Sequence, residues 1–289
     1  MTTRKGIILA GGTGTRLYPT TLAVSKQLLP VYDKPMIYYP LCVLMLAGIR
    51  EILIIVNQEH IAQFDNLLGN GSQWGLKIYY KTQSSPDGLA QAYIIAEEFL
   101  DGEPSAMILG DNIFYGQGLT DVLAKSQNQT RGGTIFGYHV SNPSQYGVIE
   151  FNKDGSVRSL AEKPRLPKTN FALTGLYFLD GTAPMRAKLV KPSERGELEI
   201  IHLLNSYLKE GNLRVDQLGR GYTWFDAGTH YSLLEASNFV RTLTERQGLH
   251  VGSPDEVAYR SGWITRSDFI SRCRKFKNSE YGKYLRKLY

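Results

Sequence analysis

The chain has 289 residues, of which 42% are hydrophobic and 21% are charged. This composition is typical of a globular protein, and the length is enough for one large core with a small appendage. The net charge of +6 does not indicate a nucleic-acid-binding protein, because residues 260–289 alone hold nine basic residues against two acidic ones, an excess that a solvated helical face explains.

The first half of the chain alternates short apolar runs with longer amphipathic ones. This pattern predicts strands at residues 6–10, 51–56, 76–81 and 105–109, and helices at residues 35–47, 59–68 and 89–100. Strands that alternate with helices at this spacing form a mostly parallel sheet through right-handed crossovers. The sequence therefore predicts an α/β, Rossmann-like fold, in which ligands bind beyond the carboxyl ends of the strands.

The first strand leads directly into a glycine-rich turn, which extends from Gly11 to Arg16, and Lys26 follows. Glycines let backbone N–H groups approach phosphate oxygens, and a guanidinium and an ammonium add positive charge. Neither the P-loop nor the dinucleotide fingerprint fits, since no glycine precedes a lysine at the required spacing and Leu17 stands where the fingerprint needs glycine. We interpret the turn as a triphosphate-binding loop, although an ordinary strand-to-helix turn contains similar glycines.

Two aspartates follow predicted strands. Asp111 comes after the apolar strand at residues 105–109, and Asp226 comes after residues 222–225. Proteins usually hold Mg²⁺ through one or two carboxylates together with substrate phosphates and waters. We therefore expect Asp111 and Asp226 to hold Mg²⁺ opposite the triphosphate loop, while a turn or helix-cap aspartate is the alternative for each residue alone.

The sequence after Asp111 is richer in strands. It predicts strands at residues 134–140, 148–151, 157–162 and 173–179, a helix at 198–210, a strand pair at 213–218 and 222–225, and a long helix at 232–247. Short helices are expected around Trp263, Phe269 and Tyr284. We expect a mixed sheet that continues the first one, a catalytic domain over residues 1–250 and a helical C-terminal extension over residues 251–289.

Several stretches resemble the signature of the sugar nucleotidyltransferase family: residues 11–19 and 25–40, 110–112, 162–164 and 224–229. The resemblance extends over nearly the whole chain, and residues 26–36 are similar to those of members that use dTTP and glucose 1-phosphate. It implies a nucleotide-diphospho-sugar transferase fold and a homotetramer. It also implies Mg²⁺-dependent transfer of a thymidylyl group from dTTP to glucose 1-phosphate, which gives dTDP-glucose and pyrophosphate.

The resemblance further implies roles for individual residues. Those implied on the nucleotide side are Gly11, Gly12, Thr13, Gly14, Thr15, Arg16, Lys26, Gln27, Gln83, Asp87, Gly88 and Asp111. Those implied on the sugar-phosphate side are Asn112, Tyr146, Gly147, Glu162, Lys163, Thr174, Gly175 and Trp224. Arg16, Lys26 and Lys163 are the expected catalytic residues. A second nucleotide-sugar site, between subunits and inhibitory, is expected at Tyr115, Gly116, Gly219, Arg220, Ser253, Glu256 and Arg260.

The residues themselves support part of these roles. The Gln83 side chain has both a donor and an acceptor, which suits the imide edge of thymine or uracil, and one methyl group separates those bases. Tyr146 and Thr174 each precede a glycine, which gives flat, closely approachable surface for a pyranose ring. The chain departs from the family pattern at Ala161, Ile201, His202 and Ala227, so the sugar preference stays open.

No catalytic base is needed for this reaction, because a phosphomonoester has its second pKa near ~6 and is already ionised at neutral pH. The five histidines make no close metal-ligand pair, and no Gly-x-Ser-x-Gly elbow is present. Transfer from UTP, or to another sugar 1-phosphate, is an alternative with the same chemistry. An alternative of another class is a nucleotide-sugar-binding regulatory protein without turnover.

A cytoplasmic location is expected. The longest uncharged stretch near the N-terminus, residues 35–49, contains Pro40 and is shorter than the roughly 20 apolar residues of a membrane span. No signal-peptide pattern is visible, because the first apolar strand is short and ends in glycines. Cys42 and Cys273 form neither a disulfide framework nor a metal-ligand pattern.

Overall fold

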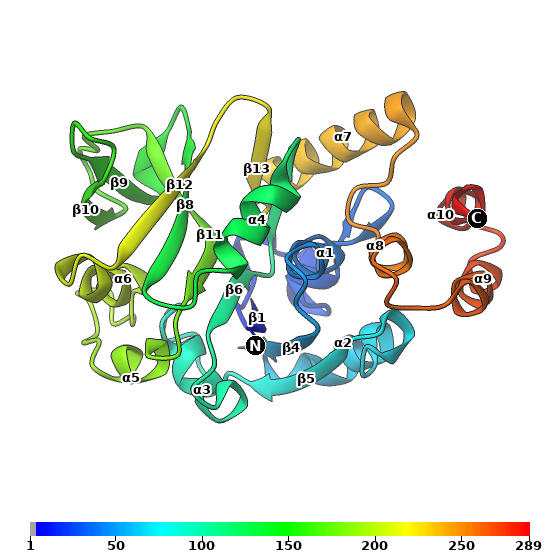
Figure 1. The fold of residues 1–289 in the computed structure, drawn as a ribbon, viewed down its shortest axis with the longest axis horizontal. Helices are drawn as coiled ribbons and strands as arrows, with labels where there is room; N and C mark the ends of the chain where they lie inside the picture. Colours follow the sequence, from blue (N-terminus) through cyan, green and yellow to red (C-terminus); the bar gives the residue numbers. More distant parts are fainter. Residues whose placement is uncertain (1–3) are drawn as a thin grey trace.

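A nine-stranded mixed sheet forms the centre of the protein in the computed structural model, which describes residues 4–289 (Figure 1). In chain order its strands are β1 (Lys5–Ala10), β4 (Glu51–Val56), β5 (Lys77–Thr82), β6 (Ser105–Leu109), β8 (Gly133–His139), β9 (Gly147–Phe151), β10 (Val157–Glu162), β11 (Phe171–Leu179) and β12 (Leu213–Leu218). Two further sheets pair β2 (Pro30–Val31) with β3 (Lys34–Pro35), and β7 (Asn112–Gly116) with β13 (Tyr222–Asp226).

The order of the strands places β1 between β4 and β6, parallel to both. β5 extends this parallel half beyond β4, whereas β11 runs antiparallel to β6 and joins it to β8, β9 and β10. From β1 the chain therefore continues through β4 and β5 on one side of that strand and then through β6 on its other side. Ligands bind where the strand order reverses in this way, beyond the carboxyl ends of the strands. The predicted α/β class with a mixed sheet is confirmed.

Helices cover both faces of the sheet. They are α1 (Tyr38–Leu46), α2 (Ile61–Leu68), α3 (Gln91–Leu100), α4 (Leu119–Gln127), α5 (Ala183–Lys188), α6 (Ile200–Lys209), α7 (His230–Gln247), α8 (Pro254–Arg260), α9 (Arg266–Lys275) and α10 (Glu280–Leu285). Side chains alternate along a strand, so Ile7 and Leu9 of β1 pack with α3, α5 and α6, and Ile8 and Ala10 pack with α1, α2 and α4. These two apolar layers fix β1, and hence the loop that follows it.

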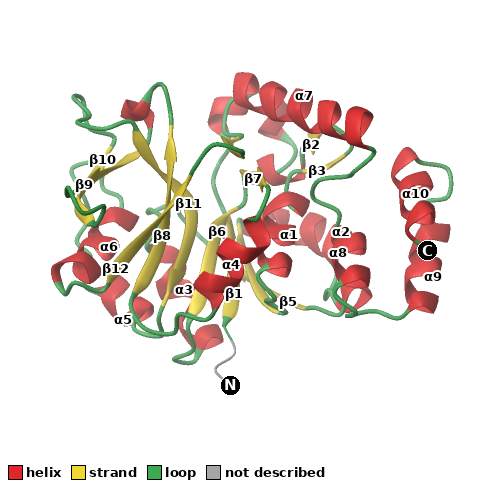
Figure 2. Ribbon diagram, turned by 45° about the horizontal axis from the view of Figure 1, so that its top comes forward, coloured by secondary structure: helices red, strands yellow, loops and turns green. Residues whose placement is uncertain are grey.

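The three C-terminal helices lie at the end of the molecule away from β9 and β10 (Figure 1, Figure 2). The side chains of Ser253, Thr265 and Ser279 cap them by accepting hydrogen bonds from backbone N–H groups of their first turns. Phe269 and Tyr284 lie in helices as predicted, within a separate apolar cluster, while Trp263 lies between α8 and α9. Among residues 4–289, none of the helices combines the length and apolar content needed to cross a membrane.

The predicted pairing of residues 213–218 with 222–225 is wrong. β12 runs parallel to β8 in the main sheet, whereas β13 runs antiparallel to β7, a strand that was not predicted. The intervening glycines suit a tight hairpin, but the partners that satisfy both strands come from distant parts of the chain. The consequence is functional, because the β13–β7 register places Asp226 opposite Asn112, next to Asp111.

Candidate active site

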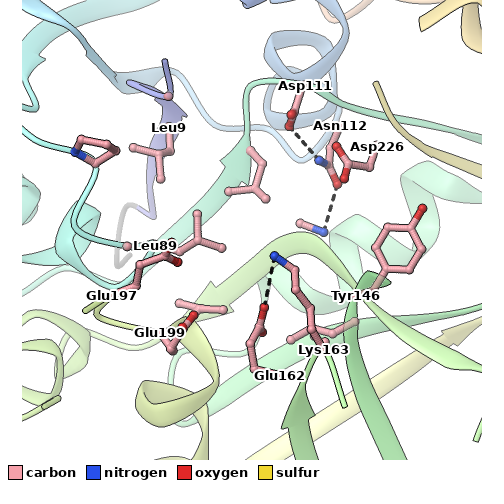
Figure 3. A pocket seen from close by; sticks show the side chains of 18 of the residues that line it. Leu9, Leu89, Asp111, Asn112, Tyr146, Glu162, Lys163, Glu197, Glu199 and Asp226 are labelled. Carbon is pink, nitrogen blue, oxygen red and sulfur yellow. Dashed lines mark hydrogen bonds and ion pairs between the residues drawn. The ribbon is translucent and has the colours of Figure 1, made fainter. Parts of the chain in front are cut away.

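A cavity of about 380 Å³ lies beyond the carboxyl ends of β1 and β6. Figure 3 shows Asp111, Asn112 and Asp226 at one end of it, and Glu162, Lys163 and Glu199 at the other. Predicted site residues in its lining are Gly12, Arg16, Lys26, Gln27, Gln83, Gly88, Asp111, Asn112, Tyr146, Gly147, Glu162, Lys163, Gly175, Trp224 and Asp226. Predicted residues outside the lining are Gly11, Thr13, Gly14, Thr15, Asp87 and Thr174.

The glycine-rich loop turns sharply after β1. Gly14 has a positive φ of 65°, which side chains disfavour, and its carbonyl oxygen accepts a hydrogen bond from Thr21 Oγ1 at 2.8 Å. Gly11 lies against Gln83, because a Cβ built on Gly11 would come within 2.3 Å of Gln83 Oε1. The loop is therefore compact, and it places Arg16 in the wall of the cavity.

Two cations of the predicted triphosphate site face the strand ends. Lys26 is buried, and its Nζ lies 2.5 Å from Asp111 Oδ2. The Arg16 guanidinium lies against Gly228, where an added Cβ would come within 2.7 Å of Nη2. The glycine loop and the segment after β13 thus approach each other across Arg16.

The two predicted metal ligands meet at this end of the cavity. Asp226 is the last residue of β13, and Asp111 directly follows β6, where its carbonyl oxygen accepts a hydrogen bond from Ala227 N at 3.0 Å. Burial opposes ionisation of Asp111, but the charge and hydrogen bond of Lys26 outweigh it and lower the pKa of Asp111. Burial and the negative charge of Asp111 raise the pKa of Asp226 to about 7. Lys26 therefore pairs with Asp111, and the neighbouring Asp226 carboxyl stays harder to ionise.

Asn112 holds the aspartate end together. Its Nδ2 donates to Asp111 Oδ1 at 3.0 Å (Figure 3). Its Oδ1 accepts from Gly175 N at 3.0 Å and from Trp224 Nε1 at 2.6 Å. A Cβ on Gly175 would come within 2.6 Å of Asn112 Oδ1, so only glycine allows this approach. Asn112 therefore joins β6, β11 and β13, and it orients the Asp111 carboxylate.

The sugar side of the cavity is built on β9 to β11 and β13. Lys163 follows β10 in a left-handed conformation, with φ of 39°, and its Nζ lies 3.7 Å from Glu162 Oε1. Burial raises the pKa of Glu162, opposed by the charge of Lys163. The Tyr146 and Trp224 rings pack edge to face with centroids 5.1 Å apart. This wall combines aromatic surface with the paired ammonium of Lys163 and carboxylate of Glu162.

Thr174 lies on the opposite side of β11 from the cavity. Its neighbours Leu173 and Gly175 line the cavity, whereas Thr174 is fully buried elsewhere. Alternation along a strand produces this arrangement, because successive side chains point to opposite faces. Of the predicted pair, Gly175 is the residue at the site.

Sequence analysis missed a group of charged residues in the cavity. Arg195, Glu197 and Glu199 all line it, and Arg195 Nη2 lies 2.7 Å from Glu199 Oε1 and 3.4 Å from Glu162 Oε1. Arg195 lies in a turn, and Glu197 and Glu199 alternate in the segment between that turn and α6, a spacing that places the side chains of an extended segment on one face. That alternation is the signal that could have identified them.

The loop after β5 is pinned to this charged segment. Leu198 N donates to Asp87 O at 2.6 Å, and Ala90 N donates to Leu198 O at 3.0 Å. Gly88 has φ of 114°, and a Cβ there would come within 2.5 Å of the Leu198 backbone. The loop expected to read the base and the segment on the sugar side are therefore positioned by each other.

A second cavity of about 320 Å³ lies among α1, β7 and α8. Its lining includes Tyr115, Gly116, Ser253, Glu256 and Arg260, while the predicted residues Gly219 and Arg220 lie outside it. Glu256 accepts hydrogen bonds from Arg260 Nε at 2.7 Å and from the Tyr284 hydroxyl. Two segments that are far apart in the sequence, residues 115–116 and 253–260, thus line one hollow.

Comparisons with known proteins identify relatives over the full chain. Residues 5–242 match the family model described as nucleotidyl transferase. Glucose-1-phosphate thymidylyltransferase of Xanthomonas campestris pv. campestris is 57% identical over 285 residues, which is 99% of this chain and 97% of the relative. The Mycobacterium tuberculosis protein of the same name is 52% identical, with 98% of each chain covered.

Solved structures share the fold. A crystal structure described as a glucose-1-phosphate thymidylyltransferase from Bacillus anthracis, in complex with sucrose, matches with a TM-score of 0.77 and 39% identity, covering 83% of this chain and 96% of that one. A UDP-glucose pyrophosphorylase in complex with UDP-glucose matches with a TM-score of 0.73 and 25% identity, covering 83% and 99%.

Proposed function

The chain belongs to the nucleotidyl transferase family, and we propose that it transfers a thymidylyl group from dTTP to glucose 1-phosphate, forming dTDP-glucose and pyrophosphate. The observation that carries the proposal is the shared cavity. Arg16, Lys26 and the glycine loop lie at one end of it, and Glu162 and Lys163 lie at the other. Relatives that are 52–57% identical over the whole chain have the corresponding name.

The reaction joins a phosphate oxygen of glucose 1-phosphate to the α-phosphorus of dTTP while the bond to the β-phosphate breaks. The nucleophile is ionised at neutral pH, so the chain has to position and neutralise charge rather than remove a proton. Arg16 and the glycine-loop amides hold the β- and γ-phosphates as charge grows on the leaving group. Lys26 reaches the α-phosphate, and Lys163 directs the sugar phosphate.

The aspartate end fits a divalent cation. No group of three or more His, Cys, Asp or Glu side chains with metal-binding geometry occurs within residues 4–289, so the donors are the two carboxylates, Asp111 and Asp226. One or two carboxylates plus substrate phosphates are the usual ligands of Mg²⁺, and both carboxylates line the cavity. Mg²⁺ bound there would neutralise charge on the triphosphate.

Pyrophosphate release across a matrix of nucleoside triphosphates and sugar 1-phosphates, with Mg²⁺, tests the proposal. We expect the highest kcat/KM for dTTP with glucose 1-phosphate. Preference for UTP or for another sugar 1-phosphate would replace the substrate assignment but keep the chemistry. Release with no pair would overturn the proposed function and favour a protein that only binds nucleotide sugars.

Lys163→Ala is expected to raise the KM for glucose 1-phosphate by about ten- to a hundredfold, because a charged hydrogen bond to the phosphate is lost. The KM for dTTP should change by less than about threefold, since Lys163 lies beyond Glu162 on the sugar side. Steady-state kinetics with each substrate varied in turn measures both values. Lys168→Ala, which removes an exposed lysine paired with Glu150, is the matched control, and equal effects of Lys163→Ala on both substrates would contradict the assignment.

A homotetramer with a second ligand site accompanies this proposal. The second cavity supports it because Tyr115, Gly116, Ser253, Glu256 and Arg260 line one hollow remote from the glycine loop. We expect sedimentation equilibrium to give about four times the chain mass of 32.4 kDa, and calorimetry to give two dTDP-glucose sites per chain. A monomer, or a single site per chain, would remove this part of the account.

A cytoplasmic location also belongs to the proposal. Cys42 and Cys273 are both buried free thiols, which suits a reducing compartment.

A further inference from the structure

Gln83 forms one end of a chain of polar side chains that extends away from the cavity. Gln83 Nε2 donates to Gln91 Oε1 at 2.5 Å, and Gln91 Nε2 donates to Asp87 Oδ2 at 2.8 Å. Gln91 Oε1 also accepts from Asp87 N at 3.3 Å. Gln91 is the first residue of α3 and was not among the predicted site residues.

The polarity of this chain is fixed at its far end. An ionised carboxylate only accepts hydrogen bonds, and a backbone N–H only donates them. Asp87 Oδ2 therefore requires the NH₂ group of Gln91, and Asp87 N requires its oxygen. Because the Gln91 oxygen is then directed at Gln83, the Gln83 side chain must present its own NH₂ group to Gln91.

The other end of the Gln83 amide is consequently an acceptor, on a side chain that lines the cavity. Gln83 Oε1 lies beside Gly11, within 2.3 Å of the position that a Cβ would occupy. It accepts no hydrogen bond from the side chains or backbone of residues 4–289. The sequence predicts that Gln83 offers a base both a donor and an acceptor, and Gln91 occupies one of the two N–H donors of its NH₂ group.

We propose that Gln91, together with Asp87, is a positioning residue that holds the Gln83 oxygen toward the cavity and so selects pyrimidine bases that carry an N3–H. Thymine and uracil have this donor. Cytosine has an unprotonated N3, so its acceptor would face the Gln83 acceptor. The inference rests on the proposed function only in placing the base next to Gln83.

Two consequences distinguish this device from general support of the loop. Removing Gln91 frees the Gln83 amide to rotate by 180°, which admits cytosine with little cost to thymine. The choice between thymine and uracil, which both carry N3–H, is not affected. Selectivity for thymine over cytosine should therefore fall, while selectivity between thymine and uracil should stay constant.

Calorimetric binding of dTTP, dUTP and dCTP, with Mg²⁺ and without sugar phosphate, tests the proposal. In Gln91→Met the ratio of dTTP to dCTP affinity should fall by at least about tenfold relative to the wild type. The ratio of dTTP to dUTP affinity should stay within about twofold. Glu98→Gln, on the exposed side of α3, is the control for an unrelated change in the same helix.

A second variant exchanges the carboxylate and the amide between positions 87 and 91 while keeping an acceptor for the Gln83 NH₂ group. In Gln91→Glu/Asp87→Asn the new carboxylate still accepts from Gln83 Nε2, and the new amide can donate to that carboxylate. This double variant should keep at least about a third of the wild-type selectivity against dCTP. The proposal would be overturned if the double variant lost as much selectivity against dCTP as Gln91→Met does. It would also be overturned if folded Gln91→Met kept the wild-type ratio of dTTP to dCTP affinity, or if the wild type bound dTTP and dCTP equally.

Measuring nucleotide binding rather than turnover separates the role of Gln91 from the proposed transferase function. Selective binding of dTTP that is lost in Gln91→Met, by a protein whose wild type forms no dTDP-glucose, would overturn the proposed function and support the role of Gln91. Thymidylyl transfer by a protein whose base selectivity is independent of Gln91 would do the reverse.

Discussion

Lys26→Met is expected to lower kcat/KM for thymidylyl transfer by about a thousandfold or more, because it removes from a buried site the cation that we propose contacts the α-phosphate. Lys26 is buried, and its Nζ lies 2.5 Å from Asp111 Oδ2. Methionine keeps the unbranched shape of the side chain but not the charge. Pyrophosphate release with saturating and subsaturating dTTP measures the loss.

The stability of the same variant provides the control. Removing one partner of a buried ion pair costs about 3–5 kcal/mol of unfolding free energy, because the Asp111 carboxylate is left beside Asp226 without its lysine. Lys26→Met/Asp111→Asn should recover much of that stability without recovering activity. A folded Lys26→Met protein that keeps kcat/KM within tenfold of the wild type would contradict the assignment.

Asp226→Asn is expected to lower kcat by about a hundredfold or more, since it removes one of two carboxylates able to hold Mg²⁺. Excess Mg²⁺ should restore part of the activity, because Asp111 and the substrate phosphates still provide ligands. Activity titrated against Mg²⁺ concentration tests this. An unchanged Mg²⁺ requirement would count against a ligand role for Asp226.

The same substitution should not weaken the fold at alkaline pH. Burial and the charge of Asp111 raise the pKa of Asp226 to about 7 from an ordinary value of 3.8. A carboxyl with a raised folded pKa favours the folded state at low pH, and this contribution is lost as pH rises from about 4 through 7. Urea unfolding in EDTA at pH 8 should therefore find Asp226→Asn at least as stable as the wild type, with the advantage vanishing toward pH 4.

The parallel half of the fold could be predicted because its signals are local. The apolar runs that became β1, β4 and β6 are buried on both faces, β5 at the sheet edge keeps only Ile78 buried, and the glycines after β1 mark the turn. Asp111 could be placed for the same reason, since a residue directly after a buried parallel strand lies at the ligand edge of the sheet.

The features that could not be predicted depend on partners far away in sequence. The pairing of β13 with β7, which brings Asp226 to Asp111, joins residues more than a hundred positions apart. The positions of β9 and β6 determine which side of β11 faces the cavity. They therefore also determine that Gly175, and not Thr174, lies at the site. The orientation of the Gln83 amide depends on its contact with Gln91 and on the contact of Gln91 with Asp87, and no motif identifies Gln91. The division of the chain near residue 250 stays a prediction.

The central claim is that one cavity holds both substrates and that the sugar phosphate attacks the α-phosphorus directly, without a covalent protein intermediate. The stereochemistry of transfer from a single diastereomer of dTTP with sulfur at the α-phosphate tests it most directly. A single in-line displacement inverts the configuration at phosphorus, and inversion in the dTDP-glucose product is the result we expect. Retention, which requires two displacements through a nucleotidylated side chain, would contradict the account.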